Sequence, residues 1–174
     1  MLTARVLTAT LAALALTAPA TALAATTTLR LDGIGPLKLG MSRMAALDTN
    51  WLSGQHSGCP LGGKPYPIDY DLKGSAAPAG ITGSAEFTGG KLTNFAFTKG
   101  VRTSTGVVAG KTTITGMVTR YRNAGYKVSA RYETTFAGTF VSVRRRHGGP
   151  QVIGAFSDGK VIHSIGVPYV PICE

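Results

Sequence analysis

The sequence predicts an α+β fold of two tandem repeats, each a short helix packed on antiparallel β-strands, which together form one continuous body. Residues 40–44 (Gly-Met-Ser-Arg-Met) open an amphipathic segment, and residues 110–114 (Gly-Lys-Thr-Thr-Ile) open another at an offset of 70. Residues 86–92, which contain a Gly-Gly turn, correspond to residues 155–161 at an offset of 69. Because a helical and a hairpin signature recur in the same order at almost the same period, we expect a duplicated helix-plus-sheet unit.

The first 24 residues predict a signal peptide. Arg5 precedes an apolar stretch over residues 6–18, Pro19 interrupts that stretch, and residues 22–24 (Ala-Leu-Ala) have the small-x-small pattern of a signal-peptidase site. The stretch is shorter than the about 20 residues that cross a bilayer, and no later stretch is apolar for long enough. We therefore expect a secreted chain that begins at Ala25 and has no transmembrane segment after cleavage.

The first repeat is expected over residues 25–99. Its helix is predicted over residues 43–52, where Ser42 is a suitable N-cap. Its strands are indicated by alternating apolar and polar residues and by one strong hairpin signal, the turn Thr88-Gly89-Gly90-Lys91. The strands are expected over residues 68–72, 81–87 and 92–97.

The second repeat is expected over residues 100–174, including a C-terminal tail. Its helix is capped by Thr112 or Thr113 and ends at Gly125, with apolar residues at helical spacing between them. The turn Ser157-Asp158-Gly159-Lys160 is the expected counterpart of the first hairpin turn. The strands are expected over residues 126–132, 136–144, 152–156 and 161–167.

The chain is strongly basic, with a net charge of +10, or +9 without the leader, whose one charged residue is Arg5. The run Arg144-Arg145-Arg146 is followed by His147 and lies between two predicted strands. It is therefore either a solvated hairpin end or a patch that docks anionic wall polymers. No pattern typical of nucleic-acid binding is present, so we expect no nucleic-acid partner.

Cys59 and Cys173 are the two cysteines of the chain, and a secreted protein meets an oxidising environment. A disulfide between them is the favoured interpretation. It would link the first repeat to the end of the second. The alternative is a catalytic thiol at Cys59 assisted by His56, which would need a lowered thiol pKa.

The sequence favours a protein that is not an enzyme and uses no cofactor or metal. Residues 110–112 (Gly-Lys-Thr) lack the upstream glycine of a phosphate-binding loop, and the three histidines have no metal-ligand spacing. Asp69 and Asp71 share the strand face opposite the apolar residues, so we expect them in solvent. The acids available to a hydrolase are Asp69, Asp71, Glu86 and Glu133, and a hydrolase needs two of them in one cleft.

Residues 37–43 (Leu-Lys-Leu-Gly-Met-Ser-Arg) resemble the helix start of secreted actinobacterial proteins with tandem α/β repeats, the group of the β-lactamase inhibitory protein-like fold. This resemblance implies a concave antiparallel sheet that binds other proteins. The chain departs from the group in its cysteines, since the inhibitor has cysteines within each repeat, and in residues 110–111, which replace the Gly-Met pair with Gly-Lys.

These observations predict a secreted, non-enzymatic module that binds a secreted or envelope protein, with an inhibitor as one form that such a module could take. Its sheet face and two hairpin tips would make the contacts. One alternative is a basic cell-envelope module that docks anionic wall polymers through residues 144–147, and another is a secreted hydrolase. The candidate tip residues are Gly89, Lys91, Asp158 and Lys160.

Overall fold

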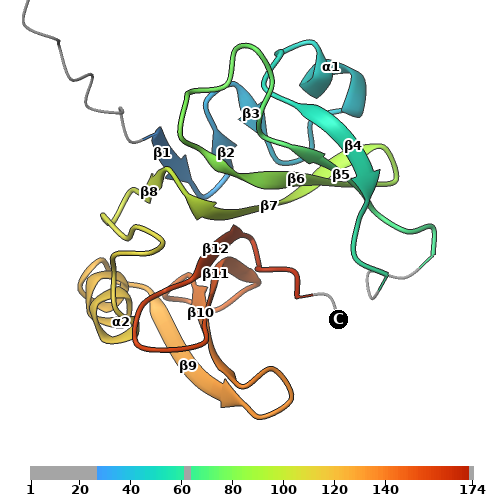
Figure 1. Cartoon of the computed structure of the whole chain (residues 1–174). Coiled ribbons are helices and arrows are strands. Elements are labelled where there is room, and N and C mark those ends of the chain that lie inside the picture. Colours follow the sequence, from blue (N-terminus) through green and yellow to red (C-terminus); the bar gives the residue numbers. More distant parts are fainter. Residues whose placement is uncertain (1–26, 61–63, 173–174) are drawn as a thin grey trace, which may run out of the picture.

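The computed structural model of the chain describes residues 27–60 and 64–172 (Figure 1). The predicted signal peptide and Cys173 lie outside the described residues. The helices are α1 (Arg43–Leu47) and α2 (Ile114–Asn123). The strands are β1 (Thr27–Arg30), β2 (Gly33–Ile34), β3 (Leu37–Lys38), β4 (Ser53–Ser57), β5 (Ile68–Asp71), β6 (Thr82–Thr88), β7 (Lys91–Lys99), β8 (Val101–Thr103), β9 (Lys127–Glu133), β10 (Gly138–Arg144), β11 (Gln151–Ser157) and β12 (Ser164–Val167).

The predicted α+β class, with a helix packed on strands in each repeat, is wrong. The described part of the chain is mostly β, with 45% of its residues in strands and 11% in helices. The first expected helix, over residues 43–52, ends at Leu47 because Asn50 adopts a left-handed conformation (φ 56°) and the chain turns into β4. Of the five residues of α1 only Ala46 is buried, so this helix does not cover a sheet.

The eight-stranded sheet is antiparallel throughout and has the order β4-β5-β6-β7-β12-β11-β10-β9. Each half is a meander of four consecutive strands, and the halves meet where β7 pairs with β12. The predicted hairpin turn at residues 88–91 is confirmed, because β6 and β7 pair up to Thr88 and Lys91 and both turn glycines have positive φ. The short pairing of β7 with β12 therefore makes one sheet out of two meanders.

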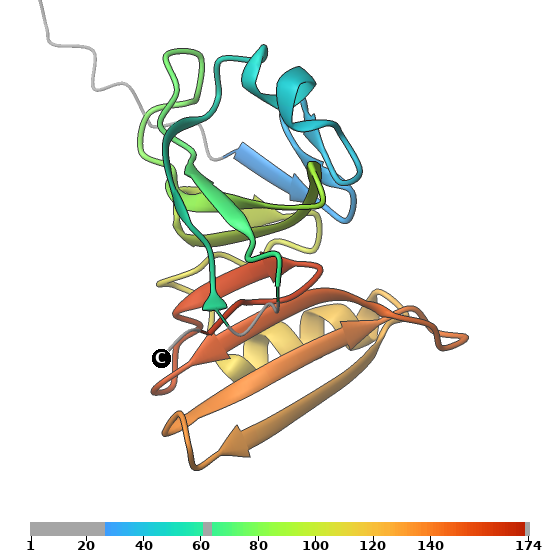
Figure 2. The ribbon, with the colours of Figure 1, turned by 90° about the vertical axis from the view of Figure 1, so that its right-hand side faces the viewer.

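The hydrophobic core lies on one face of this sheet. A smaller sheet of order β3-β2-β1-β8, in which β1 and β8 are parallel, packs with the first meander. The second meander is covered by α2, which contacts β9 and β10 (Figure 2). Along β7, Phe95 and Phe97 are fully buried, as are Met117 and Tyr121 of α2. The opposite face of the sheet carries no second layer of strands or helices among the described residues.

Similar backbone contacts fix the start of each helix. The N–H of Gly40 donates to the carbonyl of Leu92 (2.7 Å), and the N–H of Gly110 donates to the carbonyl of Ile162 (2.8 Å). Leu92 and Ile162 therefore occupy equivalent places at an offset of 70, one residue more than the sequence alignment of the turns suggested.

The second predicted turn, at residues 157–160, is not a two-residue hairpin. The chain leaves β11 at Ser157 and enters β12 only at Ser164. The hydroxyl of Ser157 donates to the carbonyl of Val161 (2.6 Å) and accepts from the N–H of Gly159 (3.2 Å). The longer connection lets Val161 bridge to Thr113 at the start of α2.

After β12, residues 168–172, here called the tail, run back across the face of the sheet that lacks a core. The N–H of Tyr169 donates to Oδ1 of Asn94 (3.4 Å), and Nε2 of Gln151 donates to the carbonyl of Pro168 (2.9 Å). The tail can lie this close because two paired residues beneath it, Gly154 and Gly166, have no side chains. A Cβ on Gly166 would lie 1.8 Å from the carbonyl oxygen of Tyr169.

We expect Gly166→Ala to lower the free energy of unfolding by roughly 1–3 kcal/mol, because the new methyl group forces the tail off the sheet. Urea unfolding at fixed pH measures this change. Gly159→Ala is the matched control, since a Cβ there meets nothing within 4 Å and should leave the midpoint near that of the parent protein. Equal stabilities for the two variants would contradict this account of the tail.

Candidate functional site

The face of the eight-stranded sheet opposite the core, here called the open face, is the candidate site. Strand alternation sets its composition, because side chains of successive residues point to opposite faces. On β7, Phe95 and Phe97 point into the core, whereas Ala96 and Thr98 point to the open face. The same alternation on the neighbouring strands gives this face Ser84 and Ser164.

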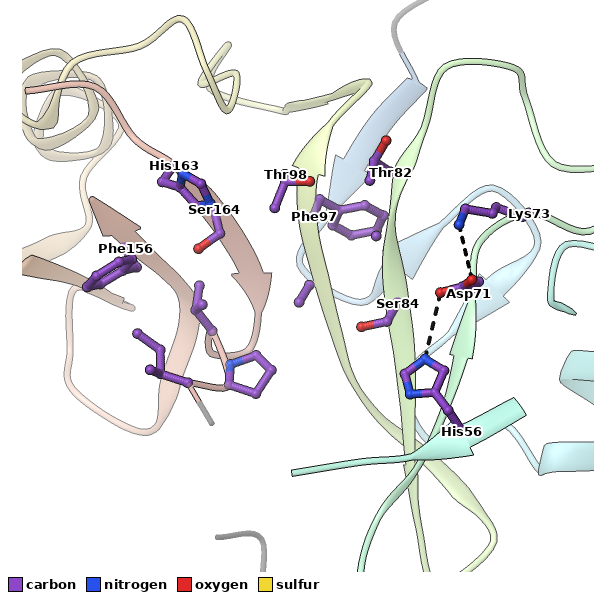
Figure 3. Close-up of a pocket in the computed structure, with 15 residues that line it drawn as sticks. His56, Asp71, Lys73, Thr82, Ser84, Phe97, Thr98, Phe156, His163 and Ser164 are labelled. Atoms are coloured by element: carbon purple, nitrogen blue, oxygen red, sulfur yellow. Dashed lines mark hydrogen bonds and ion pairs between the residues drawn. The ribbon is translucent and has the colours of Figure 1, made fainter. Parts of the chain in front are cut away.

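A groove of about 470 Å³ lies on the open face where β7 meets β12 (Figure 3). Hydroxyl side chains line it from three adjacent strands, namely Ser84 on β6, Thr98 on β7 and Ser164 on β12. Residues 170–172 of the tail form an apolar wall. The groove is therefore a mixed surface of hydroxyl groups and hydrocarbon, of a size typical of binding pockets.

A charged trio flanks the groove on the side of the first meander. Nζ of Lys73 lies 3.2 Å from Oδ2 of Asp71, and Nε2 of His56 lies 3.7 Å from Oδ1 of the same carboxylate (Figure 3). All three side chains are at least one-third exposed, so these contacts contribute little to stability. They leave the trio free to contact a ligand.

A ladder of phenylalanines continues the site across the second meander. The ring centroids of Phe140 and Phe156, which are opposite each other in the β10–β11 register, are 5.0 Å apart, and those of Phe136 and Phe140 are 5.6 Å apart. Phe156 also lines the groove, and its ring passes over Gly138, where a Cβ would lie 2.4 Å from it. All three rings are partly exposed.

Asp69 and Glu86 form a buried acidic pair beneath the tail. They are opposite each other on β5 and β6, with 9% and 4% of their surfaces exposed. The hydroxyl of Tyr169 donates to Oε1 of Glu86 (2.7 Å). The expectation that Asp69 faces solvent is therefore wrong, because the strand face it shares with Asp71 is the one that the tail covers.

Burial, together with the charge of Glu86, raises the pKa of Asp69 to about 6, although His56 opposes the rise. Burial likewise raises the pKa of Tyr169, and the hydrogen bond to Glu86 adds to the effect. The Oδ1 atom of Asp69 is buried and has no hydrogen-bond partner among the described residues. Ionising Asp69 beside Glu86 beneath the tail is therefore unfavourable.

The four acids considered for a hydrolase do not meet in one cleft. Asp69 and Glu86 are sealed under the tail, and Asp71 belongs to the charged trio. Glu133 lies on β9, where Oε1 pairs with Nε of Arg131 at 3.0 Å. In the part of the chain that the structure describes, no three His, Cys, Asp or Glu side chains gather in a way that could hold a metal ion.

The predicted disulfide has local support at one end. Cys59 is 8% exposed, and its Sγ lies 3.8 Å from the carbonyl oxygen of Ile172, the residue before Cys173. Since Cys173 lies outside the described residues, the pairing stays a prediction. The ring of His56, which the alternative requires to activate the thiol, lies 3.2 Å from the carbonyl oxygen of Ser57 and 3.7 Å from Asp71.

The candidate hairpin tips lie at opposite ends of the sheet. Gly89 precedes β7 and Lys91 is the first residue of β7, while Asp158 and Lys160 precede β12. Because β7 and β12 are antiparallel, with Ile165 opposite Phe97, the two tips point away from each other. One small ligand on the open face could not touch both.

The basic run lies at the β10–β11 connection. Arg144, Arg145, Arg146 and His147 are all exposed, and Nη1 of Arg144 donates to the carbonyl of Gly149 (3.3 Å). Within residues 27–60 and 64–172, none of the four takes part in an ion pair. Neither helix in this region is long and apolar enough to cross a membrane.

The phenylalanine ladder was missed at the sequence level, although the signal was present. Phe140 precedes Val141 and Phe156 follows Ala155, so in each predicted strand an aromatic residue alternates with smaller apolar ones. Both smaller residues are buried in the core, which places the aromatic ring on the other face. An aromatic residue at the solvent-side position of a strand is the observation that would have indicated a contact surface.

Comparisons of this chain with models of protein families, with curated proteins and with solved structures found no match. The resemblance to secreted tandem-repeat proteins therefore stays a prediction from residues 37–43.

We expect the buried acidic pair to make stability depend on pH. Since the folded-state pKa of Asp69 is raised from 3.8 to about 6, the folded state binds this proton more tightly, and ionisation of Asp69 costs stability as pH rises from about 4 to about 6. The loss at neutral pH is at most about 3 kcal/mol. Asp69→Asn should remove most of that dependence and be more stable than the parent protein at pH 7, as measured by urea unfolding at several pH values. Asp71→Asn, on the same strand but partly exposed, should keep the parental slope, and a parental slope in Asp69→Asn would refute the assignment.

Proposed function

We propose that the protein is a secreted, non-enzymatic binding module whose open face contacts a secreted or envelope protein. The observation that carries this proposal is a sheet face that no second layer of the described strands or helices covers and that presents a phenylalanine ladder beside a groove. Aromatic side chains are enriched in protein interfaces, and exposed apolar surface on a soluble protein marks contact sites. An inhibitor is the particular case in which the bound partner is an enzyme.

The layout of the open face fits a protein better than a small molecule. The ladder extends away from the groove onto β10, so the two together cross several strands. A partner could insert one side chain or loop into the groove and rest a flatter surface on the rings. The charged trio would lie at the rim of such a contact, where charges chiefly affect association rate and specificity.

The open face supports binding rather than hydrolysis. The carboxyl groups that do come together, those of Asp69 and Glu86, are enclosed by the tail. The hydroxyl of Tyr169 donates a hydrogen bond to Glu86. A substrate would have to displace the tail to reach them. We therefore propose no reaction for the acidic pair and assign it a role in holding the tail.

A single substitution in the groove tests the binding surface. Thr98→Arg places a long charged side chain on the groove floor, and we expect it to lower retention of the partner by about tenfold or more. The measurement is quantitative capture from culture supernatant and from the wall fraction. Thr119→Arg makes the same change on the exposed side of α2 and should retain the partner fully. Equal retention by both variants would exclude the groove, and capture that survives protease treatment of the wall fraction would exclude a protein partner.

The second candidate function is docking to anionic wall polymers through residues 144–147. It is favoured by the exposure of all four side chains and by their lack of carboxylate partners in the described chain. Such binding is electrostatic and should weaken as salt screens the charges.

We expect the triple variant Arg144→Ala, Arg145→Ala, Arg146→Ala to lose most salt-sensitive binding to purified wall material. Sedimentation of the wall with protein at low and high salt measures this. Arg43→Ala with Arg120→Ala and Arg122→Ala removes the same charge elsewhere and serves as the control. If both triple variants lose binding equally, net charge and not this patch is responsible.

A further inference from the structure

The outer edge of the eight-stranded sheet at β9 is long and regular. All seven residues of β9 pair with β10, from Lys127 opposite Arg144 to Glu133 opposite Gly138, without a bulge. Among the described residues β9 has no strand on its other side, and Figure 2 shows it along the outer margin of the sheet. Such an edge presents unpaired backbone groups that can pair with another strand.

This edge is open to another molecule. Five of the seven side chains of β9 are exposed, and Tyr132 has 60% of its surface exposed although it is aromatic. The one side chain that caps the backbone of β9 in the described structure is Arg122 of α2, whose Nη2 donates a long hydrogen bond (3.4 Å) to the carbonyl of Val128. A guanidinium on an exposed helix surface can swing aside.

We propose that β9 pairs antiparallel with β9 of a second copy, about a two-fold axis that passes through Ala130. This register places Lys127 of one copy opposite Glu133 of the other, and the symmetry repeats the pair. It also places Val128 opposite Tyr132 twice. Cross-strand pairs of opposite charge, and of a β-branched with an aromatic residue, are the ones that stabilise antiparallel sheets.

The charges also select this register over its neighbours. A shift of two residues in one direction brings Lys127 opposite Arg131, and a shift in the other brings Arg131 opposite its own copy. Both arrangements place like charges opposite each other, which is unfavourable. Lysine on an edge strand normally prevents pairing, but here each lysine meets a glutamate.

The pairing would keep the two open faces on the same side. Lys127, Ser129, Arg131 and Glu133 alternate with residues that face α2, so they belong to the open face, and a two-fold axis perpendicular to the sheet leaves each face on its own side. The second copy would therefore double the width of the open face without covering the groove.

The test is a charge exchange between the two positions, carried out on protein expressed from the full sequence and recovered from the culture medium. Sedimentation velocity over a roughly hundredfold range of concentration should show a monomer–dimer equilibrium for the parent protein. Lys127→Glu and Glu133→Lys each place two like-charge pairs in the interface, and each should weaken dimerisation by about tenfold or more. The double exchange should restore it.

An equimolar mixture of the two single variants provides the sharpest readout. One variant then carries two glutamates and the other two lysines, so the mixture should form heterodimers at concentrations at which each variant alone is mainly monomeric. Circular dichroism controls for folding of each variant. The proposal is overturned if the parent protein stays monomeric over the whole range, if single variants dimerise as well as the parent, or if the mixture stays monomeric.

Discussion

The pairing of β7 with β12 is the interaction on which the rest of the molecule depends. It comprises only the register pairs of Ile165, Gly166 and Val167 with residues 97, 96 and 95. Its strength comes from the side chains beneath it, since Phe95, Phe97, Ile165 and Val167 are all fully buried. Because this short pairing joins the two meanders into one sheet, the groove, the tail and the open face all lie across it. A change that separated β7 from β12 would remove the candidate site along with the fold.

The tail links β12 to buried polar side chains of the first meander. It leaves β12, passes over Gly166 and Gly154 and reaches Asn94 and Glu86, so a segment of the second half of the chain bonds to side chains of the first. Enclosing Asp69 with Glu86 is unfavourable, because a buried carboxylate loses its hydration and repels its neighbour. The hydrogen bonds of Tyr169 and the burial of the tail offset this unfavourable free energy.

Local signals in the sequence were sufficient to predict some turns and strands, but not how these elements pack on one another. The Gly89-Gly90 turn was predicted correctly because a two-residue hairpin turn needs positive φ at both positions, which two consecutive glycines allow. The second turn failed because Ser157 bonds to Val161 and delays the next strand, which no dipeptide signal reveals. The first helix failed because Asn50 breaks it early, and β1–β3 lie before the first strand that the sequence predicted. The wrong solvent exposure of Asp69 arose from strand alternation itself, which cannot foresee that a distant tail will cover the polar face.

The position of β12 also governs when the protein can fold. This strand follows all the other described strands in the sequence, yet it lies in the middle of the eight-stranded sheet, between β7 and β11. Without residues 164–172, β7 and β11 each keep an unpaired inner edge. The two meanders therefore cannot join into one sheet before this segment has folded between them. A chain cut short before β12 would expose both edges and would be prone to aggregate.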